Sequence, residues 1–453
     1  MSYKQEAVKR QDEIVADLKA MVAIKSIIDE TTISENAPYG ANIRQALDLF
    51  LDMAKRDGFT YKDVDGHAGY IEYGEGEELV GVLGHLDVVP LGDGWTKDPL
   101  GCEEEDGYIF GRGTSDDKGP SIAAYHALKI LKDNNVKLNR RVRLIVGCDE
   151  ETGFRCVEYY KQVEEVPNFG FTPDANFPVI YGEKGIIQLY LNSEYPTIIT
   201  ELNAGEVGNV VIGRASAKLS VDLDEAAFTA YLSKHNLVGS VTDNTYYLEG
   251  KSAHAMAPQE GLNAGVYLLS FIAEAHNDEF AKHLADFTHS YNGHGLNIDF
   301  EGKYMGPLTL NLGVLRINEN TQSALIDIRY PDGYVAEDVF KAIRAKVEPL
   351  NFSLDIDTDK DIVFLDPEGD MIKILEEVYR TETGDYESPL ITMGGGTYAK
   401  AFENHVAYGM EFPLIKHPES VGDVHQADEA VSKAALIDGT AIYAKAIEKL
   451  CNM

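Results

Sequence analysis

The chain has 453 residues, of which 44% are hydrophobic and 25% are charged, so neither disorder nor a collagen-like repeat is expected. Its 40 lysines and arginines stand against 75 aspartates and glutamates, which gives a formal net charge of −35 at pH 7. Such a chain repels phosphate backbones and anionic lipid surfaces, which argues against nucleic-acid and membrane partners. The acidity could serve solubility alone, or some of the carboxylates could hold cations.

The cysteines and the first residues predict a cytoplasmic protein. Residues 1–10 are polar and amphipathic and lack the apolar stretch of a signal peptide. No run approaches the ~18 apolar residues of a membrane span. The four cysteines, Cys102, Cys148, Cys156 and Cys451, are too sparse for a disulfide framework. We expect them to be buried small hydrophobic residues.

The first part of the chain alternates predicted helices with short apolar runs. Helical periodicity predicts helices at about 3–24, 41–56 and 119–133. Apolar runs predict buried strands at 79–84 and 142–147. This order indicates an α/β fold with helices on both faces of a sheet, whose ligands bind beyond the carboxyl ends of the strands.

The pattern changes after about residue 185. Alternating apolar and polar residues predict strands at 186–193, 210–221 and 308–315, and helices are expected at 261–275 and 335–347. Helical texture returns later, at 371–382 and 429–450. The simplest arrangement is a discontinuous domain, residues 1–183 plus 361–453, interrupted by an α+β domain of residues 184–360.

Five short segments concentrate histidine, aspartate and glutamate, and most of them follow or end an apolar run. They are 84–87 (GHLD), 111–119 (GRGTSDDKG), 149–151 (DEE), 172–174 (TPD) and 424–429 (VHQADE). Histidine with carboxylate is the ligand set of Zn²⁺ and related first-row cations. A single histidine at a strand end is more often structural, and an acidic pair is often a solvated loop. The occurrence of all five segments together favours a metal site.

In this order the segments resemble the M20 family of metallopeptidases with two catalytic cations, over most of the chain. Asp117 stands where acylases and desuccinylases of the family often carry methionine. The pattern is more similar to the dipeptidase branch, in particular the PepV-type enzymes (Xaa-His dipeptidase, carnosinase-like). The resemblance implies a mixed-sheet zinc-peptidase catalytic domain with an inserted α+β lid domain made of two ferredoxin-like subdomains.

The resemblance also implies the metal ligands. Asp116 would bridge two divalent cations, with His85 and Asp174 completing one position and Glu151 and His425 the other. The cations are expected to be Zn²⁺, although Mn²⁺ and Co²⁺ also accept such ligands. One bridging carboxylate and two further ligands for each cation leave coordination positions open for water and substrate.

Two further carboxylates receive roles from the same resemblance. Asp87 would orient the imidazole of His85. Glu150 would take a proton from the water that bridges the metals and return it to the leaving amine. The family pattern also implies a cis peptide bond between Asp116 and Asp117.

The insertion contains candidate substrate contacts. By resemblance, His254 would donate to the oxyanion and Arg329 would bind the α-carboxylate of the substrate. Asn209 is a candidate for a transition-state contact, and Gly395 and Gly396 could let backbone amides approach the substrate carboxylate. Without the family, His254 would be an exposed loop histidine, and Arg329 could equally be an exposed strand residue.

These expectations predict a cytoplasmic binuclear metallodipeptidase that acts on free dipeptides. An N-acyl-amino-acid deacylase or desuccinylase of the same family is the alternative, and a non-catalytic peptide- or metal-binding protein is a third. A serine or cysteine hydrolase is disfavoured, since no Gly-x-Ser-x-Gly motif is present. In the dipeptidases that the chain resembles, the extra half of the insertion replaces the lid of a partner subunit, and the resemblance therefore implies a monomer.

Overall fold

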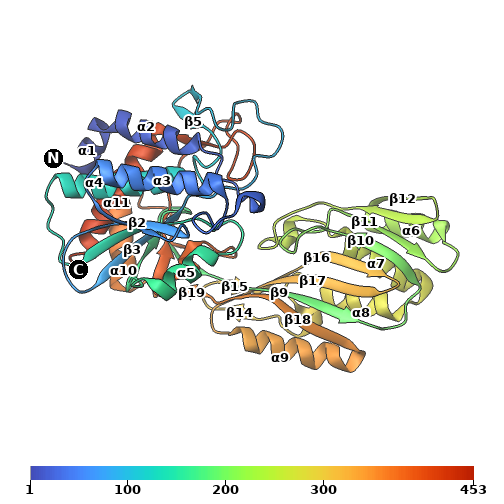
Figure 1. The fold of residues 1–453 in the computed structure, drawn as a ribbon. Coiled ribbons are helices and arrows are strands. Elements are labelled where there is room, and N and C mark those ends of the chain that lie inside the picture. The colour runs from blue at the N-terminus through green and yellow to red at the C-terminus, as the bar shows by residue number, and fades with distance from the viewer. Residues whose placement is uncertain (1) are drawn as a thin grey trace. The chain divides into compact units, whose positions relative to one another are not determined.

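The computed structural model describes residues 2–453 and divides into two compact units (Figure 1). Unit 1 comprises Met1–Tyr181, Val363–Ile391 and Thr397–Met453. Unit 2 comprises Gly182–Ile362 and the short segment Thr392–Gly396. The chain therefore leaves unit 1 and returns to it.

Unit 1 is built on a mixed β-sheet flanked by helices. In order across the sheet, its strands are β1 (Thr60–Val64), β2 (Ala68–Tyr73), β6 (Arg141–Gly147), β3 (Leu79–His85), β7 (Phe169–Thr172), β21 (His405–Ala407), β8 (Ile180–Glu183) and β19 (Val363–Phe364), and β20 (Ile391–Met393) pairs with β8. A small separate sheet contains β22 (Ala430–Ser432), β5 (Tyr108–Phe110) and β4 (Glu104–Glu105). The helices are α1 (Tyr3–Lys9), α2 (Gln11–Val22), α3 (Ala41–Arg56), α4 (Lys118–Asp133), α5 (Arg155–Val163), α10 (Asp370–Thr383) and α11 (Lys433–Leu450). The predicted α/β class with a mixed sheet is confirmed.

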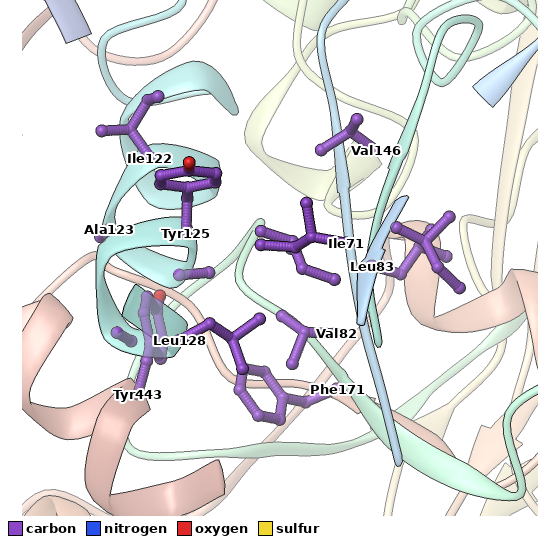
Figure 2. Packing of buried hydrophobic residues seen from close by; sticks show 14 of the residues in the cluster. Ile71, Val82, Leu83, Ile122, Ala123, Tyr125, Leu128, Val146, Phe171 and Tyr443 are labelled. Atoms are coloured by element: carbon purple, nitrogen blue, oxygen red, sulfur yellow. The ribbon is translucent and has the colours of Figure 1, made fainter. Parts of the chain in front are cut away.

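The core of unit 1 lies between the sheet and its helices. Figure 2 shows Val82 and Phe171 on the side of the sheet that faces α4, whereas Leu83, the next residue of β3, points to the other side. Alternation of this kind buries both faces of a central strand, and all seven residues of β3 are buried. Each large apolar side chain buried in this way stabilises the fold by roughly 1.5–3 kcal/mol.

Both ends of the chain contribute to unit 1. Figure 1 shows α1, in blue, beside α11, in red, and Lys4 of α1 pairs with Asp438 of α11 at 2.9 Å. None of the helices in residues 2–453 combines the length and apolarity that a membrane span requires. All four cysteines are free and buried, as predicted.

Two predicted helices differ from those observed. The helix predicted at 3–24 is divided into α1 and α2, because the backbone of Arg10 leaves helical geometry and its guanidinium donates to Asp133 at 2.6 Å. The helix predicted from 429 begins only at Lys433, because Ala430–Ser432 pair with β5 as β22. Ser432 then caps α11 by accepting from the amide of Ala435 at 3.0 Å.

Unit 2 consists of one antiparallel sheet with helices packed on it. Its strands, in order, are β12 (Val238–Thr242), β13 (Thr245–Glu249), β11 (Arg214–Leu219), β10 (Ile199–Ala204), β16 (Thr309–Asn318), β17 (Thr321–Tyr330), β9 (Gly185–Ser193) and β18 (Phe352–Lys360), and a separate hairpin contains β14 (Glu301–Gly302) and β15 (Gly306–Pro307). Its helices are α6 (Glu225–His235), α7 (Ala264–His276), α8 (Glu279–Thr288) and α9 (Ala336–Val347). The eight strands form one sheet, and most of their buried apolar side chains belong to one hydrophobic cluster. The two predicted subdomains would therefore share both the sheet and the core.

Candidate active site and metal centre

The carboxyl ends of three neighbouring parallel strands meet at one edge of the unit 1 sheet. In the pairing of β3 with β6, His85 lies opposite Gly147, and β7 runs parallel to β3 on its other side. Residues that directly follow these strands are therefore brought together. They include Glu150 and Glu151 after β6 and Asp174 after β7.

Asp116 lies between two histidines. Its Oδ1 is 3.0 Å from Nε2 of His85, and its Oδ2 is 2.8 Å from Nε2 of His425. Asp174 lies 3.7 Å from the same nitrogen of His85, and Glu151 lies 3.4 Å from that of His425. Asp116 is thus common to two groups of three side chains, and within each group the ligand atoms all lie within 4.8 Å of one another.

The segment that carries Asp116 is fixed by its neighbour Asp117. The peptide bond between the two residues is cis, as the resemblance implied. The buried Asp117 carboxylate accepts from the backbone amide of His85 at 2.9 Å and from the hydroxyl of Ser121 at 2.8 Å. A Cβ atom at Gly84 would collide with both Ser121 and Asp117, so only glycine allows this approach.

The donor atoms fit divalent cations. Nδ1 of His85 is 3.0 Å from the carbonyl oxygen of Asp87, which can only accept, so Nδ1 carries the proton and Nε2 can offer its lone pair. Oε1 of Glu151 is buried and has no hydrogen-bond partner among residues 2–453. A buried carboxylate oxygen without a partner is costly, and a cation would satisfy it.

The electrostatics of the cluster favour added positive charge. Burial lowers the pKa of the His85 imidazole, but hydrogen bonds to Asp116, Asp174 and Asp87 outweigh burial and hold that pKa well above its usual value. Hydrogen bonds to Asp116 and then Glu151 raise the pKa of His425 to about 10. The excess of carboxylates therefore draws protons onto the histidines, and divalent cations would supply the same charge.

Asp87 connects His85 to the acidic loop after β6. Its carboxylate accepts from the backbone amides of Glu150 at 3.1 Å and Glu151 at 3.0 Å. The same carboxylate is 3.5 Å from Nδ1 of His85, farther than the carbonyl oxygen of Asp87 itself. Asp87 thus orients the imidazole chiefly through its backbone, and its carboxylate positions the two glutamates.

Glu150 has an environment suited to proton transfer. Burial raises the pKa of its carboxyl well above the usual value, and the negative charges of Asp174, Glu151 and Asp116 raise it further, against the influence of His85. A carboxyl group with a raised pKa is a better base than an ordinary surface glutamate. The backbone amide of Glu150 donates to the carboxylate of Asp87, which fixes the main chain at this residue.

In unit 2, Arg329 is buried and already paired. Its Nε and Nη2 donate to Asp327 at 2.6 and 2.9 Å, and Gln188 donates to the same carboxylate at 2.8 Å. Nη1 faces the carbonyl oxygen of Gly394 at 3.4 Å. Arg329 is therefore not an exposed strand residue, and it lies beside the glycine run that contains Gly395 and Gly396.

Asn209 and His254 lie on adjoining segments of unit 2. The carbonyl oxygen of Asn209 accepts from the amide of Ala255 at 2.9 Å, and Val210 forms a β-bridge with His254. Nδ1 of His254 accepts from the amide of Met256 at 3.1 Å. Both predicted side chains are exposed.

Sequence reasoning missed three charged residues close to the candidate sites. Arg112 and Glu429 form a buried ion pair next to Asp116 and His425, and Asp327 holds Arg329. A signal for Asp327 was present, because residues two apart on a strand share a face. Arg112 and Glu429 lie within two of the metal-ligand segments but are far apart in the sequence.

Residues 81–449 match the sequence profile of Peptidase family M20/M25/M40. The chain belongs to this family. As an M20 family member it is a hydrolase, and the predicted resemblance is confirmed.

Full-length relatives and a solved structure agree with the M20 assignment. Proteins of Staphylococcus haemolyticus (strain JCSC1435) and Bacillus subtilis (strain 168), both named "Putative dipeptidase", are each 38% identical over 473 residues, with at least 99% of every chain covered. The crystal structure of human carnosine dipeptidase 1 superposes with a TM-score of 0.58 at 16% identity, covering 100% of this chain and 99% of that one. That structure shows a shared fold.

Proposed function

We propose that this M20 hydrolase is a binuclear metal-dependent dipeptidase that cleaves the peptide bond of free dipeptides. The observation that carries the proposal is Asp116, whose two oxygens each face one histidine of a separate three-residue group. The names of the full-length relatives support dipeptides as the substrate class. An M20 fold that lacked this arrangement would support binding but not hydrolysis.

His85, Asp116 and Asp174 would hold one cation, and Asp116, Glu151 and His425 would hold the other. Two divalent cations at such a site polarise a carbonyl group and lower the pKa of water. The histidine and carboxylate donors suit Zn²⁺, with Mn²⁺ and Co²⁺ as further candidates.

Glu150 would act as the general base. Its raised pKa suits a group that accepts a proton from the attacking water and passes it to the leaving amine. Asp87 supports this role, because its carboxylate accepts from the backbone amides of both Glu150 and Glu151. A glutamate fixed in this way needs little reorganisation during the reaction.

Unit 2 would serve as the lid domain, which the sequence predicts at residues 184–360. This domain would bind the substrate. His254 would donate to the oxyanion, with Asn209 on the adjoining segment. Arg329 would bind the α-carboxylate near the amides of Gly395 and Gly396. Because Asp327 occupies the edge of the guanidinium formed by Nε and Nη2, the substrate would meet the edge formed by Nη1 and Nη2.

Dipeptide hydrolysis is tested by metal content and by a substrate panel. The protein is purified without chelator, its metal content is measured by mass spectrometry, and kcat/KM is compared for free dipeptides and their N-acetylated forms. We expect about two divalent cations per chain and a strong preference for the free amine. Faster hydrolysis of the N-acetylated forms would instead identify a deacylase, and a metal-free active enzyme would contradict the binuclear proposal.

Replacing Arg329 tests carboxylate recognition. Arg329→Lys keeps the positive charge that neutralises Asp327 but removes the planar guanidinium group, which can donate two parallel hydrogen bonds to a carboxylate. We expect kcat/KM for a free dipeptide to fall by roughly 10–100-fold, the effect of losing a charged hydrogen bond. For the same dipeptide with an amidated C-terminus the fall should be much smaller, because no carboxylate is present. An equal loss with both substrates would mean that Arg329 only supports the strand.

We further propose a monomeric, cytoplasmic enzyme. Four buried free cysteines suit a reducing compartment, and a lid supplied by the same chain needs no partner. Light scattering of the purified protein measures the oligomeric state, and a dimer at micromolar concentration would refute the monomer.

A further inference from the structure

A buried ion pair joins two of the ligand-bearing segments. Nη1 of Arg112 lies 2.5 Å from Oε2 of Glu429, and each side chain is only 1% exposed. An ion pair buried this deeply is costly unless its remaining donors and acceptors are satisfied. In this pair Nη2 of Arg112 and Oε1 of Glu429 bond to the backbone around the candidate metal site, whereas the buried Nε of Arg112 has no hydrogen-bond partner among residues 2–453.

Glu429 holds the segment that ends at Asp116. Its Oε1 accepts from the backbone amides of Gly113 at 3.0 Å, Ser115 at 2.9 Å and Asp116 at 3.3 Å. Its carbonyl oxygen accepts from the amide of Gly111 at 2.9 Å. Glu429 thereby sets the path of the chain up to the carboxylate shared by both cation positions.

Arg112 holds the segment that carries His425. Its Nη2 donates to the carbonyl oxygen of His425 at 3.1 Å and to that of Leu91 at 3.2 Å, and the guanidinium lies 5.2 Å from the ring centre of Trp95. His425 has a φ of 66°, in the left-handed region that side chains other than glycine seldom adopt. Arg112 helps to stabilise this conformation, in which the imidazole reaches Asp116.

The first cation position, made of His85, Asp116 and Asp174, is held by other residues. The backbone of His85 donates to Asp117, and the imidazole of His85 donates to the carbonyl oxygen of Asp87. Loss of the ion pair should therefore disturb the position of His425 and Glu151 more than that of His85 and Asp174.

We propose that Arg112 and Glu429 form a positioning pair that sets the second cation position, made of Asp116, Glu151 and His425. The inference rests on the proposed binuclear function. It adds that residues which do not bind metal determine whether the second cation is held tightly, as partners of metal ligands do in other metalloenzymes.

The test is a Zn²⁺ titration of the metal-free full-length chain, followed by competition with a chromophoric chelator and with metal content measured by mass spectrometry. For Glu429→Gln we expect one of the two dissociation constants to rise by about 10–100-fold and the other to stay unchanged. Glu72→Gln is the matched control, because it removes the nearest carboxylate partner of the buried Arg143 in the same unit, 2.7 Å away. Both Zn²⁺ dissociation constants of the control variant should equal those of the unaltered protein.

A second variant separates positioning from folding. Arg112→Met combined with Glu429→Gln leaves no unpaired buried charge, so its Tm should exceed that of Glu429→Gln, yet one cation should still bind weakly. Unchanged constants in Glu429→Gln, or an equal rise in both constants, would overturn the positioning pair. Failure of the unaltered protein to bind two cations would overturn the proposed function instead.

Discussion

Glu150→Gln is expected to retain both cations and to lose turnover by roughly 10²–10⁴-fold, the usual contribution of a general base. The amide has nearly the size of the carboxyl group but cannot accept the proton. Glu150 belongs to neither of the two three-residue groups found among residues 2–453 that could hold a metal. Metal content by mass spectrometry and kcat for a free dipeptide measure the two effects separately.

Glu158→Gln provides the control for Glu150. Glu158 lies on α5 shortly after the same loop, and its exposed side chain pairs with Lys161 at 2.7 Å. Its substitution should leave kcat and metal content unchanged. If Glu150→Gln keeps kcat within a few-fold of the unaltered enzyme, another group must accept the proton.

Asp116→Asn is expected to abolish binding of both cations and hence activity. One oxygen of Asp116 faces each histidine, and an asparagine presents one acceptor oxygen and one NH₂ group, so it cannot bridge two cations. Metal content should fall from about two per chain to well below one, and excess Zn²⁺ should not restore turnover.

His425→Ala distinguishes bridging from simple ligation. It removes a ligand from one position only, so about one cation per chain should remain. Normal stoichiometry and affinity in Asp116→Asn would show that the carboxylate does not bridge. The single-position loss should also be detectable as one missing binding step in a Zn²⁺ titration.

Local pattern predicted two of the three strands whose ends form the site, β3 and β6, but not the four-residue β7. The apolar run at 79–84 lies within β3, and the helix predicted at 41–56 has the bounds of α3. Parallel pairing then explains why residues that follow β3, β6 and β7 meet, since such ends share one edge. His425 could not be placed in this way, because its segment follows no strand of this sheet, and its prediction depended on the family resemblance.

Contacts between distant segments were not predictable from spacing. Nothing near Arg112 indicates that its partner is Glu429, and nothing in the loop of Glu150 indicates that Asp87 accepts its amide. Arg329 is ambiguous in the sequence because an arginine on a strand is usually exposed, and only its pairing with Asp327 explains its burial. The partner and the burial of such a side chain depend on tertiary packing, which cannot be inferred from local periodicity.

The discontinuity of unit 1 has a consequence for the order in which the protein is made. Strand β21 lies between β7 and β8 in the sheet, although its residues leave the ribosome more than two hundred residues after those strands. Before β21 is synthesised, the strand between β7 and β8 is missing from the sheet. Asp116 lacks the imidazole of His425 until that later residue is also made. Most of unit 2 is synthesised earlier as one stretch, Gly182–Ile362. A chain that terminates before His425 can therefore contain a nearly complete unit 2 but not the assembled cluster, so such incomplete translation products should show no hydrolytic activity.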